Sequence, residues 1–521
     1  MQKETEVKHW ADQCADEVIA KFGDKKSYVC ATGISPSGTV HFGNFRETIT
    51  TDLVVKALES KGKKVHFVYS WDDYDRFRKV PANIKENMDE FIGMPVSQVK
   101  DPFKCHSSYA EHFEKEYEKN LPMVSVRPKF IYQNEKYGNC GYAEDIKFAL
   151  GNKEKIKTVL DEHRKEPLEK DWLPLTVYCE KCKKDLTKIT DYDGKYSITY
   201  ECECGYKDTV DFRKKGIVKL PWRVDWPMRW NYEKVEFEPA GKEHSTPGGS
   251  RTTANIIVKE VWNREPPVHK MYDFIILKGQ GGKMSGSLGN VITLREVLEI
   301  YEPDIVRYFF AGTRPNTEFF VSFDLDVLKV YEDFDKCERI YFKTEKANEE
   351  KDYIKQKRIY ELSAIEIPKK QPIQPIFRHL VNLIQIYEND FSKIGEYYKK
   401  ELKTDFDRER LKQRTERAKN WLDKYALDDY KFKVQEEVKV ELNEKEKKAL
   451  LLLKEKLEKN KYTEQKLFEE FYSICKEADI KNTDFFKAAY KVLINKERGP
   501  KLANFILTLG KERVVGLLNK I

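Results

Sequence analysis

The chain has 521 residues, of which 40% are hydrophobic and 13% aromatic, and its formal net charge is +7. This composition excludes wholesale disorder and provides for more than one core, and the length suggests three or four domains of about 150 residues each. No apolar run approaches the ~20 residues of a membrane-spanning helix, and the N-terminal sequence lacks the hydrophobic core of a secretory signal. A charge this small does not by itself indicate a nucleic-acid partner. We therefore expect a soluble, cytoplasmic protein without a membrane partner.

A strand, a helix and a second strand are predicted near the start of the chain. Residues 27–33 form an apolar run that ends in glycine, residues 44–60 have helical periodicity, and residues 65–70 repeat the strand pattern. This order is typical of a parallel βαβ unit, the start of a Rossmann-like nucleotide-binding sheet. A further strand is predicted at 272–277, so much of the segment between is interpreted as an insertion, over about residues 80–215.

The last 191 residues differ from the rest in composition, because they contain only four of the 25 glycines. They are rich in Lys, Glu, Leu and aromatic residues at helical spacing. We expect an α/β catalytic domain over residues 1–330 and an all-α domain over residues 331–521. Residues 294–312 are also predicted to be helical, and the proline-bearing stretch 367–375 is interpreted as a connection.

The loop that follows the first predicted strand has features of an anion-binding turn. It runs from Gly33 to Asn44 and ends in His41-Phe42-Gly43-Asn44. If the loop opens a helix, its backbone N–H groups and the helix dipole favour a phosphate. His41 and Asn44 would then be neighbouring hydrogen-bond donors on the first turn. An ordinary strand–helix turn with a surface histidine is the alternative while this loop is considered alone.

A second glycine-rich loop follows the strand predicted at 272–277. It spans residues 279–287 and contains Lys283, Ser285 and Ser287. A lysine beside two hydroxyls suits the stabilisation of charge that develops on phosphate oxygens. A flexible surface loop is the alternative here.

Together, the two loops resemble the paired signatures of class I aminoacyl-tRNA synthetases, known as HIGH and KMSKS. The resemblance implies a catalytic role for His41, Asn44, Lys283, Ser285 and Ser287. It implies that ATP contacts a wider set of residues: Pro36, Ser37, Gly38, His41, Gly43, Asn44, Lys283, Met284 and Ser285. Mg²⁺ is expected with the nucleotide. Two positions depart from the family pattern: Asn44 replaces the second histidine and still donates a hydrogen bond, and Gly286 replaces the second lysine.

Five segments resemble the class I lysyl-tRNA synthetases in particular, namely residues 32–47, 70–81, 220–230, 237–244 and 277–287. The resemblance covers about the first 320 residues and implies L-lysine as the substrate. An ε-ammonium group requires a carboxylate in a partly dry pocket with aromatic rings beside its methylene stem. Asp225, between Trp222 and Trp226, has this character, although core packing explains the tryptophans equally well. By resemblance, the lysine-binding residues are Thr32, Gly33, Trp222, Asp225, His244 and Tyr272.

Four of the ten cysteines occur as two close pairs, Cys179-x2-Cys182 and Cys202-x-Cys204. The pattern resembles a zinc ribbon, in which four thiolates surround the ion as a tetrahedron. The second pair is one residue tighter than usual, which leaves the fourth ligand open. Reduced free cysteines are the alternative.

A second group of possible metal ligands consists of Asp101, Cys105, His106 and His112. Pro102 at a first helical position, with Asp101 as its cap, predicts a helix start. On that helix, Asp101, Cys105 and His112 would share one stripe, with His106 beside it. A capped helix with a half-buried cysteine and surface histidines is the alternative.

The resemblance implies ATP-dependent ligation of L-lysine to tRNA(Lys) through lysyl-adenylate, with release of diphosphate and AMP, by a monomer. It also implies that the helical domain binds the anticodon, although aromatic residues such as Trp421, Tyr425 and Tyr430 are mostly expected in its core. The alternatives are another class I synthetase, a different nucleotidyl transferase, and a non-catalytic tRNA-binding relative. A nucleotidyl transferase does not explain the helical tail, and intact His41, Lys283 and Ser285 argue against a non-catalytic relative.

Overall fold

The computed structural model describes residues 8–279, Met284 and residues 291–521. The chain forms two compact units, each assembled from several segments. The first unit comprises residues 1–298, 303–321 and 337–367, and the second comprises residues 299–302, 322–336 and 368–521.

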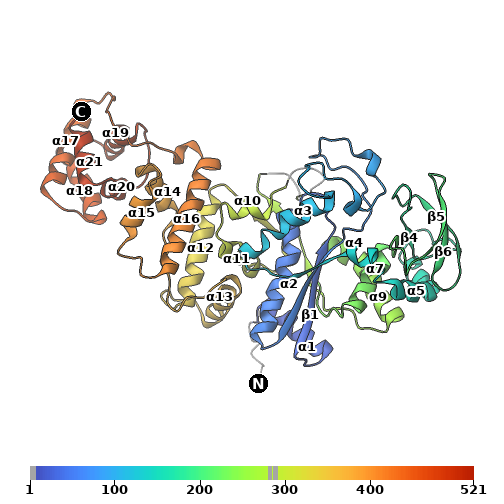
Figure 1. The fold of residues 1–521 in the computed structure, drawn as a ribbon. Coiled ribbons are helices and arrows are strands. Elements are labelled where there is room, and N and C mark those ends of the chain that lie inside the picture. Colours follow the sequence, from blue (N-terminus) through green and yellow to red (C-terminus); the bar gives the residue numbers. More distant parts are fainter. Residues whose placement is uncertain (1–7, 280–283, 285–290) are drawn as a thin grey trace, which may run out of the picture. The chain divides into compact units, whose positions relative to one another are not determined.

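Parallel strands form the sheet of the first unit: β1 (Ser27–Ile34), β2 (Lys64–Trp71) and β3 (Lys129–Tyr132), in that order. Helix α2 (Phe42–Ser60) connects β1 with β2 and packs against both strands (Figure 1). The predicted βαβ unit and the helix expected at 44–60 are therefore confirmed. Because parallel strands present their carboxyl ends at one edge, the loop after β1 lies where such sheets bind ligands.

The strand predicted at 272–277 is wrong in one respect, because the structure divides it into two. β10 (Met271–Tyr272) pairs with β9 (Ala240–Gly241), whereas β11 (Ile275–Leu277) pairs with β12 (Phe319–Val321). The chain changes partner at residues 273–274, whose carbonyl oxygens accept hydrogen bonds of 2.8 and 2.9 Å from the Arg46 guanidinium. This buried arginine lies far away in the sequence, so the break has no local sequence signal.

The helical prediction for 294–312 is confirmed except at residues 299–302, which separate α10 (Leu294–Leu298) from α11 (Pro303–Gly312). Proline lacks the N–H that a continuing helix would need and fits the first turn of a new one. Pro303 therefore begins α11 instead of continuing α10.

The segment between β3 and β9 folds around its own core of buried aromatic and aliphatic residues. Its helices are α4 (Gln133–Gly138), α5 (Ala143–Gly151), α6 (Lys153–Asp161) and α7 (Trp222–Tyr232). Its strands are β4 (Thr176–Val177), β5 (Thr187–Tyr192), β6 (Ser197–Cys202), β7 (Lys207–Asp211) and β8 (Val218–Lys219). β5, β6 and β7 form an antiparallel sheet, and the two close cysteine pairs lie before β5 and at the end of β6.

Other helices of the chain are α1 (Trp10–Phe22), α3 (Tyr109–Glu118), α8 (Lys242–Ser245), α9 (Ser250–Trp262), α12 (Asp326–Tyr341) and α13 (Glu350–Ser363). From Pro368 to Ile521 the helices are α14 (Phe377–Ile386), α15 (Phe391–Tyr398), α16 (Asp405–Lys424), α17 (Glu444–Lys459), α18 (Glu464–Glu477), α19 (Asn482–Ile494), α20 (Leu502–Leu509) and α21 (Lys511–Leu518). The prediction of a helical C-terminal region is confirmed. One core joins α17 to α21, and Arg414 of α16 is buried between Glu302 and Asp335 at 2.7 and 2.8 Å.

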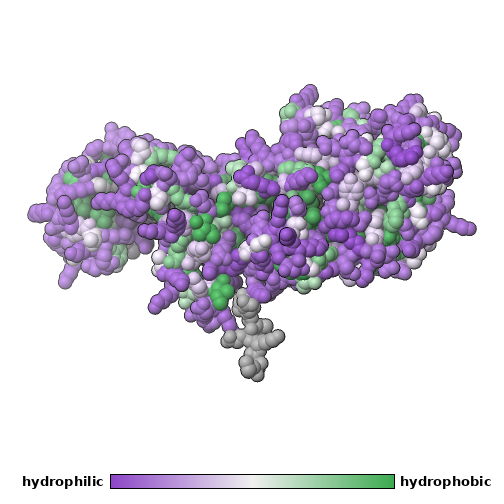
Figure 2. Space-filling model, turned by 60° about the horizontal axis from the view of Figure 1, so that its bottom comes forward, coloured by the Kyte–Doolittle hydropathy of each residue, from purple (hydrophilic) through white to green (hydrophobic). Residues whose placement is uncertain are grey.

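Hydrophilic residues cover most of the face shown in Figure 2, and apolar residues are scattered among them. Within the described ranges, none of the helices combines the length and the apolar character that a membrane span requires.

Candidate functional site

His41 and Asn44 start helix α2 with two reciprocal hydrogen bonds. His41 is the N-cap, and its Nδ1 accepts the N–H of Asn44 at 3.3 Å. The side-chain oxygen of Asn44 accepts the N–H of His41 at 3.1 Å. Because Nδ1 accepts, the neutral imidazole carries its proton on Nε2 and is a donor there. Both side chains thus lie at the positive end of a 19-residue helix.

Two described residues of the segment around the second signature, Met284 and Ile292, lie close to the first signature. The N–H of Phe42 donates to the carbonyl of Ile292 at 2.7 Å. The Cε of buried Met284 lies 3.7 Å from the position that a Cβ on Gly43 would occupy. That Cβ would also lie 2.8 Å from the Nδ1 of His41, so glycine is what allows the ring to approach the backbone. Met284, the one described residue of the second signature, therefore lies beside the first signature.

The other residues expected at the ATP site lie in the turn before α2. Pro36 is buried, Ser37 is exposed and Gly38 is half-buried. The carbonyl of Ser37 accepts a hydrogen bond of 3.0 Å from the hydroxyl of Tyr109. Three predicted catalytic residues, Lys283, Ser285 and Ser287, lie outside the described residues.

A pocket opens beside the carboxyl ends of β1 and β2. Thr32 and Gly33 of β1 contribute to its wall, together with Trp222 and Trp226 of α7. The two indole rings stack with centroids 4.9 Å apart. The polar side chains of the wall are Ser70, Asp72, Gln133, Arg229, Glu233 and Glu238. The pocket thus combines aromatic faces with acidic groups and contains three of the residues predicted to bind lysine.

Glu47, on the second turn of α2, is a carboxylate whose hydrogen-bond donors are neutral. Its Oε1 accepts from the hydroxyl of Thr32 at 3.0 Å and from the N–H of Gly33 at 3.1 Å. Its Oε2 accepts from the hydroxyl of Tyr272 at 2.6 Å. Burial, reinforced by the charge of Glu238, raises the pKa of Glu47 to about 7. Arg251 interacts with it electrostatically, but none of the described cations forms a direct ion pair with it.

Asp225, on α7, is buried behind the pocket wall and already has charged partners. It accepts a hydrogen bond from the hydroxyl of Tyr137, and its Oδ2 lies 3.2 Å from the Nε of Arg229 and 3.9 Å from the Nζ of Lys219. Arg229 also reaches the pocket, where its Nη1 lies 2.7 Å from Asp72. Two cations of the chain therefore balance the charge of Asp225, and this carboxylate fixes Arg229 in place.

His244 and Tyr272 each contact a residue beside the pocket. The ring of His244, on α8, lies edge-on to Trp226 with centroids 6.2 Å apart, and its Nδ1 is 2.8 Å from the hydroxyl of Ser250. Burial lowers the pKa of His244, so the ring is neutral at pH 7. Tyr272, on β10, contacts Glu47 as described above.

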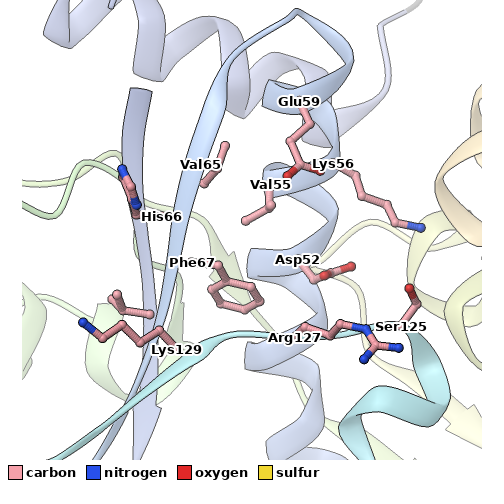
Figure 3. Close-up of a pocket in the computed structure, with 11 residues that line it drawn as sticks. Asp52, Val55, Lys56, Glu59, Val65, His66, Phe67, Ser125, Arg127 and Lys129 are labelled. Carbon is pink, nitrogen blue, oxygen red and sulfur yellow. The ribbon is translucent and has the colours of Figure 1, made fainter. Parts of the chain in front are cut away.

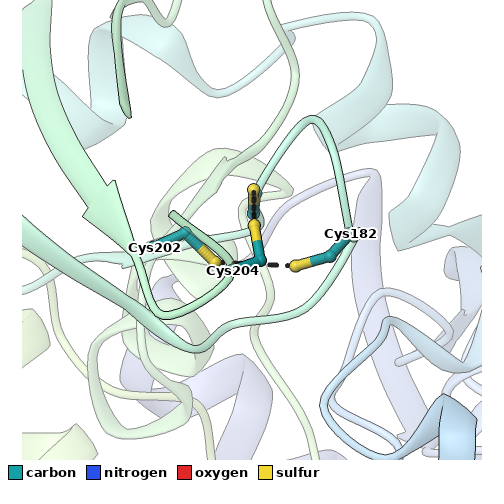
Figure 4. Close-up of side chains that lie close together, drawn as sticks. Cys182, Cys202 and Cys204 are labelled. Atoms are coloured by element: carbon teal, nitrogen blue, oxygen red, sulfur yellow. Dashed lines mark hydrogen bonds between the residues drawn. The ribbon is translucent and has the colours of Figure 1, made fainter. Parts of the chain in front are cut away.

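The four cysteines of the ribbon-like motif converge (Figure 4), and their sulfur atoms all lie within 4.8 Å of one another. The Sγ atoms of Cys179 and Cys204 are 3.7 Å apart, and those of Cys182 and Cys202 are 3.5 Å apart. Tetrahedral zinc with Zn–S bonds of about 2.3 Å requires sulfur separations of roughly 3.8 Å. A backbone N–H from Tyr206 lowers the pKa of Cys204 to about 7. The donor set therefore fits zinc.

The second group of ligand types, Asp101, Cys105, His106 and His112, also converges within 4.8 Å. The Sγ of Cys105 lies 3.1 Å from the Nδ1 of His106 and 3.2 Å from that of His112. The helix predicted to start at Pro102 is wrong, however, because α3 begins only at Tyr109, with Ser108 as its cap. The Asp101 carboxylate instead accepts three backbone N–H groups, those of residues 103, 105 and 106, and so folds this segment into a loop.

A different cavity of about 420 Å³ lies against the last turns of α2 (Figure 3). Its charged wall includes Asp52, Lys56 and Arg127. Lys56 follows His41 by fifteen residues, which corresponds to about 22 Å along a helix. This cavity is therefore separate from the signature loops.

Comparison with known proteins decides the family. The chain matches the model of class I tRNA synthetases (K) over residues 8–366 and that of the anticodon binding domain over residues 407–521. The lysine–tRNA ligase of Borreliella burgdorferi is 47% identical over 520 residues, covering 98% of this chain and 99% of the relative. That of Thermococcus kodakarensis is 41% identical over 518 residues, covering 97% and 98%. The chain belongs to the class I tRNA synthetase (K) family.

Two acidic residues beside the pocket of this synthetase are absent from the sequence-based prediction. Glu47 lies three residues after Asn44 on the same helix, and residues at this spacing lie on one face. This spacing could have indicated that Glu47 lies near the first signature. Glu238 accepts hydrogen bonds from the indole N–H groups of Trp226, at 3.1 Å, and Trp230. Nothing in the local sequence distinguishes Glu238 from a surface glutamate, because its partners lie on α7.

Proposed function

We infer that the chain ligates L-lysine to tRNA(Lys) in an ATP-dependent reaction. Its similarity to lysine–tRNA ligases along almost the whole of both chains carries this inference, and the proximity of Met284 to Gly43 of the first signature supports it. Lysine first reacts with ATP to form lysyl-adenylate and diphosphate. The lysyl group then passes to the terminal adenosine of the tRNA, and AMP is released.

The catalytic residues we propose act on charge rather than as covalent nucleophiles. His41 and Asn44, at the positive end of α2, donate to the phosphates of ATP, whose Mg²⁺ ion balances part of the negative charge. The negative charge that develops as diphosphate leaves is stabilised by Lys283, Ser285 and Ser287. The ATP contacts extend to Pro36, Ser37, Gly38, Gly43 and Met284. The adjacency of Met284 and Gly43 supports a site shared by both loops.

We propose that Glu47 binds an ammonium group of lysine. A buried carboxylate is stable as an ion only with a cationic partner, and the donors around Glu47 are neutral. Thr32, Gly33 and Tyr272 orient this carboxylate, while Trp222 and His244 line the substrate stem, the methylene chain of lysine. Asp225 serves the pocket indirectly, because it positions Arg229.

We propose two zinc sites in the first unit. Cys179, Cys182, Cys202 and Cys204 would hold one ion with a structural role, and Asp101, Cys105, His106 and His112 would hold another. Metal analysis of the purified chain should give two zinc ions per molecule, and Cys182→Ser should reduce this to one. Fewer than one zinc in the wild type would contradict the ribbon site, and one or fewer would contradict the pair.

We propose that the second unit binds the anticodon of the tRNA, since residues 407–521 match the anticodon binding domain family. We further propose that the synthetase acts as a monomer in the cytoplasm, where tRNA is charged.

The test is ATP–pyrophosphate exchange with each of the twenty amino acids. We expect exchange with lysine alone. Exchange driven by another amino acid would contradict the substrate, and exchange at background level with retained tRNA binding would indicate a non-catalytic relative.

A further inference from the structure

The hydroxyl of Tyr109 connects the start of α3 to the turn that precedes α2. It donates to the carbonyl of Ser37 at 3.0 Å and lies 3.9 Å from the position of a Cβ on Gly38. Burial raises the pKa of Tyr109, so the hydroxyl keeps its proton and remains a donor. The contact therefore fixes one peptide of the turn expected to hold ATP.

Packing leaves the Tyr109 side chain little freedom. The residue is fully buried, and its ring meets Phe77 and Phe113 edge-to-face with centroids 5.1 and 5.0 Å apart. Its N–H donates to the carbonyl of Val99 at 2.8 Å. A hydroxyl on so rigid a support can set the position of an exposed turn, whereas the turn cannot readily displace the ring.

The loop that precedes Tyr109 carries the four possible metal ligands. Asp101 holds the N–H groups of residues 103, 105 and 106, and His112 follows on the first turn of α3. The Cys105 sulfur lies between the two histidine nitrogens at 3.1 and 3.2 Å. An ion bound by these groups would join the loop to the turn of α3 from which Tyr109 projects.

We propose that Tyr109 is a positioning residue for the nucleotide turn, and that the Asp101–Cys105–His106–His112 cluster acts on ATP binding through it. The proposal rests on the proposed function in one respect, namely that the turn at Ser37–Gly38 contacts ATP. It assigns the cluster a role in substrate binding beyond local stability.

Tyr109→Phe tests the proposal, because it retains the ring contacts and removes only the hydroxyl. The affinity for ATP is measured by calorimetry without lysine, and the KM values for ATP and lysine are measured by pyrophosphate exchange. A hydrogen bond worth about 0.5–1.5 kcal/mol predicts a roughly two- to tenfold rise in both Kd and KM for ATP. The KM for lysine should remain unchanged.

Tyr331→Phe in the second unit is the matched control. The Tyr331 hydroxyl is also buried and donates to a backbone carbonyl, that of Ile300, at 2.9 Å. This control should lose comparable stability without any change in ATP affinity. If Tyr109→Phe loses stability but binds ATP as the wild type does, the hydroxyl is only structural and the proposal is wrong.

Cys105→Ser tests the metal-dependent part. It should lower the zinc content by one ion and raise the Kd for ATP, and combining it with Tyr109→Phe should add little, because both changes release the same turn. Loss of the ion with unchanged ATP affinity would overturn the coupling. A wild type that binds ATP but does not activate lysine would contradict the proposed function alone, since the ATP affinities would still test Tyr109.

Discussion

Asp225 and Glu47 are two carboxylates of the first unit, and they differ in how the chain balances their charge. Asp225 lies 3.2 Å from Arg229 and 3.9 Å from Lys219, both from the same chain. Glu47 receives hydrogen bonds from two hydroxyls and one backbone N–H, and burial raises its pKa to about 7. The difference teaches that a position between tryptophans does not by itself indicate a substrate contact, because cations of the chain already balance the charge of Asp225. Glu47, which has no direct ion pair among the described residues, is therefore the carboxylate that we propose for the contact with the substrate.

Asp225→Asn is the change with the largest expected effect, and it tests the difference between the two carboxylates. It removes the charge that Arg229 and Lys219 share, and both cations stay buried. We expect the free energy of unfolding to fall by about 3 kcal/mol, although each cation retains a second carboxylate partner. Denaturant unfolding measures this. An unchanged stability, with a large rise in the KM for lysine, would instead make Asp225 the substrate contact.

Glu47→Gln should affect substrate binding rather than folding. The amide keeps the size of the side chain but cannot balance an ammonium group, so we expect kcat/KM for lysine to fall about 100-fold, or ~2.7 kcal/mol. The KM for ATP should not change. Competition by norleucine, which lacks the ε-ammonium group, and by 6-aminohexanoate, which lacks the α-ammonium group, shows which group Glu47 contacts. The analogue that lacks the contacted group should bind the wild type and the variant equally. Equal loss for both analogues would contradict a direct contact.

The pH dependence of lysine binding distinguishes the two carboxylates further. Since Glu47 is protonated below a pKa of about 7, a proton competes with the substrate, and the Kd for lysine should rise about tenfold per unit as the pH falls below 7. Burial also raises the pKa of Asp72 to about 6 and that of Asp73 to about 7. The same profile must therefore be measured for Glu47→Gln, so that the titration of Glu47 is separated from that of these two residues. A profile that persists unchanged in Glu47→Gln would assign the titration to those residues.

Tyr272→Phe is the smallest change of the series. It removes one neutral donor that favours the ionised form of Glu47, so the pKa should rise and the pH profile of lysine binding should move upward. At pH 7 we expect a rise in the KM for lysine of about three- to fivefold. A profile that moves to lower pH would be inconsistent with this arrangement.

Local signals in the sequence predicted much of the fold and part of the site. Apolar runs and glycines identified β1, α2 and β2, and residue type with spacing identified both metal-ligand clusters. Partners far apart in sequence decided other parts. The break between β10 and β11 depends on Arg46. The loop at 101–107 has a local cause instead, because the Asp101 side chain accepts three nearby N–H groups that a helix would have used otherwise. Glu47 shares a helix face with the first signature, but its contact with Tyr272, 225 residues later, is not visible in the local sequence.

Charging of tRNA(Lys) with labelled lysine, by the wild type and by His41→Ala, tests the central claim most directly. The histidine caps α2 at the proposed phosphate site, so its loss should remove transition-state stabilisation without unfolding the chain. The account predicts lysyl-tRNA formation by the wild type and a rate lower by about 100-fold or more in the variant. Absence of charging by the folded wild type, or an unimpaired rate in His41→Ala, would contradict it.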